Sequence, residues 1–172
     1  MKNLLLYGLP FSGKSIVGRM LAETFDREFI DTDLEIEKRY GLSCRQLFRA
    51  RGEPAFRQLE RELLKYLSEK VHCVIALGGG TLTDPENQKI AKELGDLIYL
   101  KCGTSELKKR IGSQKELPAY LDGIDFESLE KNRALLYETI ADFVVETSDM
   151  SASLVAEKIG ETVGKQFLGT TF

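Results

Sequence analysis

Apolar residues along the chain occur in short continuous runs, separated by longer segments in which they recur at helical spacing. Short continuous runs are typical of strands that are covered on both faces, as in a parallel sheet. The pattern predicts strands over residues 2–8, 27–33, 72–80, 96–102 and 142–148.

Between these runs, apolar residues recur every three or four positions, which predicts amphipathic helices. The predicted buried faces comprise Ile16, Val17, Met20 and Leu21; then Phe56, Leu59, Leu63, Leu64 and Leu67; then Phe126, Leu129, Leu136 and Ile140; and finally Leu154, Val155, Ile159 and Val163.

Strands that alternate with helices predict an α/β fold, in which helices cover both faces of a parallel sheet. Ligands of such sheets bind beyond the carboxyl ends of the strands. Two segments interrupt the alternation. We expect extra helices over residues 34–61, and the polar segment 112–124, which contains glycine and proline, predicts a mobile loop.

Length and charge narrow the possible functions. With 172 residues we expect one domain, and a net charge of −3 with a pI near 5.4 argues against a nucleic-acid partner.

No apolar run approaches the roughly 20 residues of a membrane helix, and the N-terminal segment lacks a signal-peptide cleavage site. Cys44, Cys73, Cys102 and His72 show no metal-ligand or disulfide spacing. We therefore expect a reduced, cytoplasmic protein without a membrane partner.

The segment "GLPFSGKS" (residues 8–15) has the frame of a phosphate-binding loop between a predicted strand and a predicted helix. Gly8 and Gly13 allow backbone amides to converge on phosphate oxygens, beside the positive end of the helix. Lys14 suits the β- and γ-phosphates, and Ser15 suits Mg²⁺. The alternative is a glycine-rich turn capped by Ser15.

Two aspartates follow the second predicted strand, in "FIDTDLEIE". Asp31 and Asp33 lie on the same side, because side chains alternate along a strand. One carboxylate would bind a hydrated metal ion, while the other would accept a hydrogen bond from a substrate hydroxyl. The alternative is that Asp33 caps the next helix.

Charged residues follow at helical spacing in "RGEPAFRQLERE". Arg57 lies four residues after Glu53 and three before Glu60, on one helical face. This spacing fits a surface ladder of salt bridges, worth about 0.3–0.5 kcal/mol per pair. It also fits a site in which Arg57 binds an anionic substrate and Glu60 orients it, because a guanidinium matches a carboxylate.

The third predicted strand ends in "ALGGGT", at the same edge of the sheet. Consecutive glycines cost chain entropy. Their presence is explained if a ligand approaches the backbone closely; a tight turn is the alternative.

In this order and spacing, the motifs resemble the shikimate kinase family, a branch of the nucleoside-monophosphate-kinase-like P-loop kinases. The resemblance spans nearly the whole chain and rests on "GLPFSGKS", "FIDTDLEIE", "FRARGEPAFRQLE", "VIALGGGT" and "NRALLYETIADFVVET". It implies a three-layer sandwich around a five-stranded parallel sheet of order 2-3-1-4-5. It also implies a single kinase domain with a core (1–32, 62–111 and 125–172), an acceptor-binding region (33–61) and a lid (112–124).

The resemblance further implies a role for each matching residue. Lys14 and Ser15 would serve the phosphates and Mg²⁺ beside Gly8 and Gly13, with Asp31 holding the metal through water. Asp33 would bind the shikimate hydroxyls and act as the base, helped in catalysis by Lys14 and Arg57. The remaining implied contacts are Arg57 and Arg133 with the shikimate carboxylate, Phe48, Phe56, Gly78, Gly79 and Gly80 around the substrate, Glu60 in support, and Arg110 on the adenine.

Two positions depart from the family's pattern. Phe11 replaces a loop glycine where a positive φ is often needed, which costs a bulky residue about 1 kcal/mol. In the lid, Leu117 precedes Pro118 where the family has an arginine that contacts substrate and transferring phosphate. Loss of such an arginine costs several orders of magnitude in rate in other phosphoryl-transfer enzymes. Lys115 is the nearby cation that would substitute.

The resemblance therefore implies a monomeric, Mg²⁺- and ATP-dependent kinase that phosphorylates the 3-hydroxyl of shikimate, on the route to chorismate and aromatic amino acids. A kinase for another acceptor, such as gluconate or a nucleotide, is a second hypothesis; nucleotide kinases usually have a more arginine-rich lid. A nucleotide-binding regulator without efficient turnover is a third, motivated by Phe11 and Leu117.

Overall fold

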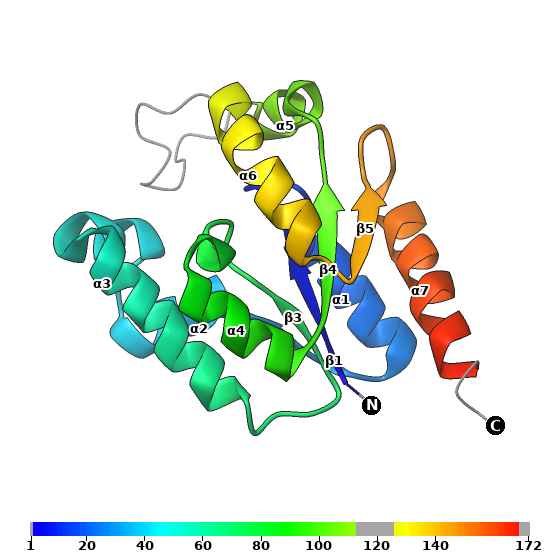
Figure 1. Ribbon diagram of the computed structural model, residues 1–172, viewed down its shortest axis with the longest axis horizontal. Helices are drawn as coiled ribbons and strands as arrows, with labels where there is room; N and C mark the ends of the chain where they lie inside the picture. The colour runs from blue at the N-terminus through cyan, green and yellow to red at the C-terminus, as the bar shows by residue number, and fades with distance from the viewer. Residues whose placement is uncertain (1, 113–125, 169–172) are drawn as a thin grey trace.

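The computed structural model describes residues 2–112 and 126–168 (Figure 1). Its parallel strands form one sheet in the order β2-β3-β1-β4-β5. The strands are β1 (Asn3–Tyr7), β2 (Glu28–Asp31), β3 (Cys73–Ala76), β4 (Gly95–Lys101) and β5 (Phe143–Glu146). The predicted strands, and the order that the resemblance implied, are confirmed.

Helices cover both faces of the sheet, as predicted. The helices of the described residues are α1 (Lys14–Phe25), α2 (Thr32–Tyr40), α3 (Cys44–Leu67), the short 3₁₀ helix η1 (Thr81–Thr83), α4 (Pro85–Leu94), α5 (Thr104–Ile111), α6 (Phe126–Ile140) and α7 (Ala152–Leu168). One face packs against α1 and α7, and the other against α3, α4 and α6 (Figure 1). None of these helices is long and apolar enough to cross a membrane.

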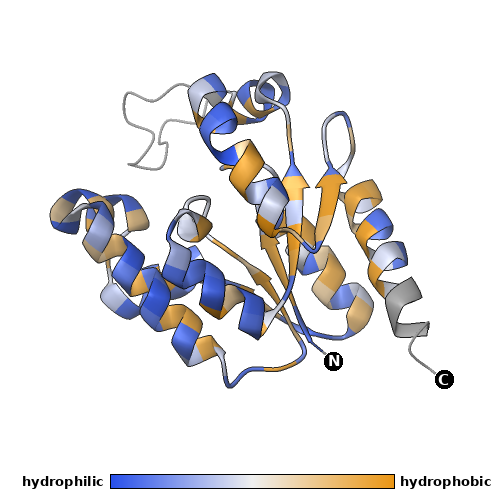
Figure 2. Ribbon diagram, viewed as in Figure 1, coloured by the Kyte–Doolittle hydropathy of each residue, from blue (hydrophilic) through white to orange (hydrophobic). Residues whose placement is uncertain are grey.

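The central strand shows why the strands are continuous apolar runs. Leu4 and Leu6 belong to the core cluster beneath α1 and α7, whereas Leu5 and Tyr7 belong to the cluster on the opposite face. Successive side chains alternate between faces, and both faces are covered, so apolar side chains follow one another without a break from Leu4 to Tyr7. The strands are accordingly mostly orange in Figure 2, while the helices carry mixed stripes.

The predicted helix faces are largely buried, with two exceptions. Val17 and Leu21 of α1 are buried, but Ile16 is 60% exposed. Val155 of α7 is buried, but Leu154 is 42% exposed. Each residue of a helix is rotated by about 100° from its neighbour, so the residue just before a buried stripe turns toward solvent.

The three cysteines lie in the core or at its edge. Cys73 and Cys102 are buried, Cys44 is half-buried, and all three thiols are free. Burial raises the pKa of each thiol, which makes it less reactive at neutral pH.

Three tyrosines join the sheet to α6. The Tyr7 and Tyr99 rings stack with centroids 5.4 Å apart, and the Tyr137 ring meets them edge-on at 5.3 and 5.5 Å. The Tyr7 hydroxyl donates to the backbone oxygen of Tyr137 at 2.6 Å. Burial raises the pKa of Tyr7 far above its usual value, so this hydroxyl keeps its proton. The cluster therefore fixes α6 over the carboxyl ends of β1 and β4.

Asn3 ties the start of β1 to neighbouring segments. Its Nδ2 donates to the backbone oxygens of Lys70 at 2.9 Å and Leu94 at 3.1 Å, and its Oδ1 accepts from the Cys73 amide at 2.9 Å. The residue is only 3% exposed, so water does not readily replace these bonds.

Replacing Asn3 by alanine should lower the free energy of unfolding by about 3 kcal/mol, because an amide and two carbonyls lose a buried partner. Urea denaturation followed by circular dichroism measures the change. Lys2→Ala is the control, since Lys2 is exposed and pairs only at the surface with Asp96. An Asn3→Ala effect no larger than that of the control would contradict the assigned role.

Candidate active site

The predicted phosphate loop connects β1 to α1 at the carboxyl edge of the sheet. Gly13 is the N-cap that precedes α1, with a φ of 98°, a conformation that glycine adopts without strain. Lys14 Nζ folds back to donate to the backbone oxygens of Gly8 at 3.2 Å and Leu9 at 2.9 Å. Burial lowers the pKa of Lys14 to about 8, against the opposing effect of Asp33. The ammonium therefore keeps most of its charge at neutral pH.

Phe11 takes the positive φ expected at its position, at 65°. A bulky residue in this left-handed region is strained by about 1 kcal/mol. Its side chain packs against the core cluster that contains Leu9 and Leu107. Such packing offsets part of the strain, so the loop retains its shape without the family's glycine.

Two cavities meet at the phosphate loop. The larger, of about 470 Å³, extends from the loop to Arg110 and Met150. The smaller, of about 200 Å³, extends to Asp33 and Gly79. The residues that line both cavities are Phe11, Lys14 and Ser15. The arrangement suits transfer of a charged group from a ligand in one cavity to a ligand in the other.

Asp31, at the end of β2, caps α2. Its Oδ1 accepts from the backbone amides of Asp33 at 3.1 Å and Leu34 at 3.4 Å. The interpretation of Asp33 as the helix cap is therefore wrong, and the Asp33 carboxyl is left for another use. The role expected of Asp31 is metal binding through water; its capping role is a finding of the structure.

Ser15 and Asp31 form a pair of oxygen ligands of the kind that Mg²⁺ prefers. The Ser15 hydroxyl donates to Asp31 Oδ2 at 2.6 Å. Within residues 2–112 and 126–168, no group of three or more His, Cys, Asp or Glu side chains is placed to hold a metal. The pair fits Mg²⁺ nonetheless, because this ion keeps several waters and takes few protein ligands, often together with substrate phosphates.

The Asp33 carboxyl lines the smaller cavity close to Lys14. The pKa of Asp33 is raised to about 7, mainly by burial and further by Glu60 and Asp31, against the effect of Lys14. A carboxylate with a pKa near neutrality is well matched to accept a proton at neutral pH.

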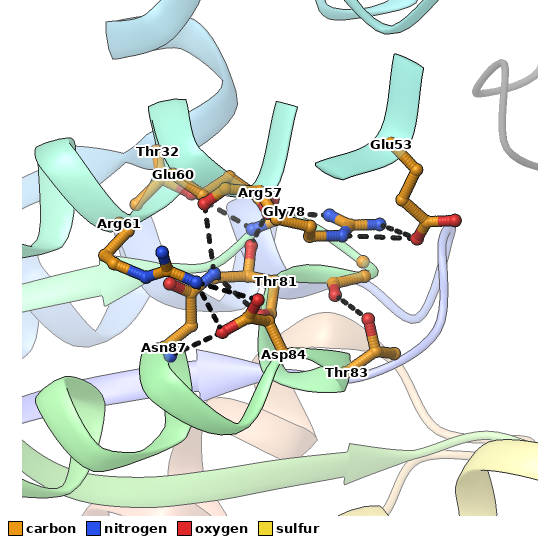
Figure 3. Close-up of polar contacts among 12 residues, drawn as sticks. Thr32, Glu53, Arg57, Glu60, Arg61, Gly78, Thr81, Thr83, Asp84 and Asn87 are labelled. Atoms are coloured by element: carbon orange, nitrogen blue, oxygen red, sulfur yellow. Dashed lines mark hydrogen bonds and ion pairs between the residues drawn. The ribbon is translucent and has the colours of Figure 1, made fainter. Parts of the chain in front are cut away.

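Arg57 and Glu60 form a buried ion pair on α3 (Figure 3). Arg57 Nη1 donates to Glu60 Oε2 at 2.6 Å, and Thr81 Oγ1 donates to Glu60 Oε1 at 2.6 Å. The Arg57 and Glu60 side chains are only 5% and 2% exposed. The ladder of ion pairs that the spacing allowed does form, since Arg57 also pairs with Glu53, but the expectation that it lies at the surface is wrong for Arg57 and Glu60. Burial opposes the charge of Arg57, but Glu60 outweighs it and raises the pKa of Arg57.

The glycines after β3 leave space for side chains of the site itself. A Cβ on Gly78 would lie 2.6 Å from Asp33 Oδ1 and 3.0 Å from Glu60 Oε1, and a Cβ on Gly80 would overlap the Arg57 guanidinium. A tight turn alone does not explain these glycines. The expected close approach to the backbone is made by the chain's own charged groups.

Two residues of α6 reach the same turn. The backbone oxygen of Gly79 accepts from Arg133 Nη1 at 2.9 Å and from the Tyr137 hydroxyl at 2.8 Å. Since these residues lie one helical turn apart, α6 holds the turn at two points. Arg133 is thereby placed over the glycine turn that also packs against Arg57.

The remaining predicted site residues lie at the margins. Arg110 of α5 lines the larger cavity and donates to the backbone oxygens of Ser12 at 3.2 Å and Thr147 at 2.8 Å. The Phe48 and Phe56 rings meet edge-to-face with centroids 5.7 Å apart on α3. Phe56 is buried and Phe48 is half-buried, so Phe48 is the more accessible of the two.

The predicted lid falls almost wholly outside the described residues. These exclude residues 113–125, with Lys115, Leu117 and Pro118, and they also exclude the side chain of Phe126. The proposals for Lys115 and for the missing arginine therefore stay predictions.

The sequence pattern alone does not reveal three polar residues that shape the site. Thr32 Oγ1 accepts from the Gly78 amide at 3.0 Å, and Thr81 and Tyr137 make the bonds described above. Thr32 and Thr81 stand inside the motifs "FIDTD" and "ALGGGT", which is a usable signal. Tyr137 also stands inside a quoted motif, "NRALLYETIADFVVET", but the spacing does not show that its hydroxyl reaches Gly79, because that contact depends on how α6 packs.

Comparison with known proteins agrees with this geometry. A family model described as "Shikimate kinase" matches residues 10–164. The shikimate kinase of Pelotomaculum thermopropionicum is 38% identical over 92% of this chain and 94% of its own length, and that of Xylella fastidiosa is 37% identical over 91% and 89%.

Solved structures give the same result. A shikimate kinase from Acinetobacter baumannii, in complex with shikimate, superposes with a TM-score of 0.88 and 31% identity. The match covers 96% of this chain and 94% of that one. On the family model, the sequence relatives and the shared fold together, this chain belongs to the shikimate kinase family.

Proposed function

We propose that this chain transfers the γ-phosphate of ATP to the 3-hydroxyl of shikimate, giving shikimate 3-phosphate and ADP. The observation that carries the proposal is the junction of two cavities at Lys14, with Asp33 in the smaller one. Family membership and the bound shikimate of the Acinetobacter relative support the choice of acceptor.

In this proposal ATP occupies the larger cavity, with its adenine against Arg110. The amides around Gly8 and Gly13 and the start of α1 receive the phosphates. Lys14 neutralises charge that builds up on the β- and γ-phosphate oxygens during transfer.

Ser15 and Asp31 would hold Mg²⁺, with Asp31 acting through a water. When bound, the ion supplies positive charge to the β- and γ-phosphate oxygens. The short bond between the Ser15 hydroxyl and Asp31 Oδ2 supports this assignment, because it gathers both oxygens at one point beside the loop.

The acceptor occupies the smaller cavity and its surroundings. Arg57 and Arg133 bind the shikimate carboxylate, and Glu60 orients Arg57. Further proposed contacts of the acceptor are with Phe48, Phe56, Gly78, Gly79 and Gly80. Asp33 then takes the proton of the 3-hydroxyl while the oxygen of that hydroxyl attacks the γ-phosphorus. The bond between the γ-phosphorus and the β–γ bridging oxygen breaks, and ADP leaves. Positioning and charge neutralisation supply most of the rate enhancement in such transfers.

Residues 33–61 would form the acceptor-binding region, and residues 112–124 would act as a lid that excludes water. Lys115 would contribute the positive charge of the family's lid arginine. A monomeric state and a cytoplasmic location belong to the same proposal.

The proposal is tested by measuring ADP release from MgATP with shikimate, with gluconate and with nucleoside monophosphates. We expect release that depends on shikimate and is at least about tenfold faster than with the other acceptors, the minimum that a few lost polar contacts provide. Release with gluconate or a nucleotide instead would assign another acceptor. A folded protein that binds MgATP but releases no ADP with any of them would indicate a nucleotide-binding regulator.

Replacing Asp33 by asparagine should lower kcat by about 10²- to 10⁴-fold, because an amide cannot accept the proton. The affinity for MgADP, measured by calorimetry, should stay nearly unchanged. Asp26→Asn is the matched control, since Asp26 is exposed and adopts a left-handed φ of 51° that asparagine tolerates. If the Asp33 variant kept its kcat within a few-fold, Asp33 would not be the base.

A further inference from the structure

Glu53 binds one edge of the Arg57 guanidinium, the group that is proposed to bind the carboxylate of the acceptor. Glu53 Oε1 accepts from Arg57 Nε at 3.3 Å and from Arg57 Nη2 at 3.1 Å, while Nη1 bonds to Glu60 (Figure 3). Nε and Nη2 form one edge of the planar fork that a carboxylate binds with two parallel bonds. That edge is therefore already engaged by a carboxylate of the chain itself.

The two carboxylates that bind Arg57, those of Glu53 and Glu60, differ in how easily a ligand can displace them. The Glu60 side chain is 2% exposed and also accepts from Thr81, whereas the Glu53 side chain is 53% exposed. Breaking a buried pair leaves an uncompensated charge at large cost, but a half-exposed carboxylate can return to water at little cost. Glu53 is thus the partner of Arg57 that a ligand can displace.

Charge balance gives a reason for displacement. Two carboxylates already surround the single guanidinium of Arg57. An acceptor carboxylate that joined them would meet two like charges at close range, and like charges in a partly buried site repel strongly. Release of Glu53 to solvent removes one of these charges.

The backbone at Glu53 is suited to such release. Gly52 interrupts α3 with a φ of 78° and a ψ of 167°, so Glu53 begins a new helical segment. A Cβ built on Gly52 meets only Pro54 Cδ, at 3.9 Å, so no other element crowds that side of the joint. A carboxylate in the first turn of a helical segment is also favoured by the helix dipole, so a released Glu53 carboxylate stays in a favourable position.

Resting on the proposed function, we propose that Glu53 is a specificity-determining residue. It is a resident carboxylate that engages Arg57 until a carboxylate acceptor displaces it. A tethered group competes at an effective concentration near the millimolar range or above. Small anions such as acetate lack further contacts with the site and displace Glu53 poorly. An acceptor that also contacts Asp33 and the Gly79 turn displaces it more readily.

The test replaces Glu53 by glutamine, which keeps the length of the side chain and removes its charge. The KM for shikimate should fall about two- to fivefold, the range expected for an ion pair with one exposed partner, while kcat stays within about twofold. The KM for the methyl ester of shikimate, which has no carboxylate, should not fall. Glu62→Gln, at an exposed position of the same helix, is the control and should change neither value.

A second measurement does not depend on turnover. Acetate is titrated at constant ionic strength while the midpoint of thermal unfolding is followed. The Glu53→Gln protein should be stabilised at about two- to fivefold lower acetate concentrations than the wild type. This result would support the proposal even if shikimate-dependent ADP release failed, which would overturn only the proposed acceptor.

The opposite outcome is equally clear. If Glu53 served to orient Arg57, its replacement would raise the KM for shikimate and leave the acetate response unchanged. An unchanged KM with an unchanged acetate response would also overturn the proposal, since Glu53 would then hold nothing that a carboxylate competes for.

Discussion

The buried ion pair between Arg57 and Glu60 is the interaction on which the acceptor side of the molecule depends. It joins α3 to the glycine turn after β3, through Thr81 on one side and the space over Gly80 on the other. Two charges can be held in this dry environment only because each has a short, directed partner. Thr81, Glu53 and the glycine turn all lie directly against that pair.

The parallel sheet provides the second constraint. Because β1, β2 and β3 are adjacent and parallel, the phosphate loop, the Asp31–Asp33 segment and the glycine turn all emerge at one edge. The tyrosine cluster then fixes α6, and with it Arg133, over the same edge. Charged groups from segments far apart in the sequence thus meet without any long connection.

Much of this could be predicted from the sequence because it depends on local pattern. Continuous apolar runs identify buried strands, and the phosphate-loop motif identifies one wall of the site. Burial is harder to predict, because the spacing of Glu53, Arg57 and Glu60 is the same on a solvated helix as on a packed one. The capping role of Asp31 and the reach of Tyr137 depend on neighbouring elements, and local spacing does not contain that information.

The tyrosine cluster has a further, optical consequence. The chain contains six tyrosines and no tryptophan, so tyrosine dominates its intrinsic fluorescence. Three of these rings lie within about 5.5 Å of one another, and the hydroxyl of Tyr137 bonds to the glycine turn. Excitation energy can pass between rings so close, and the emission of the cluster is sensitive to the hydrogen bond at its end. The protein therefore carries a native chromophore whose one end touches its own active site.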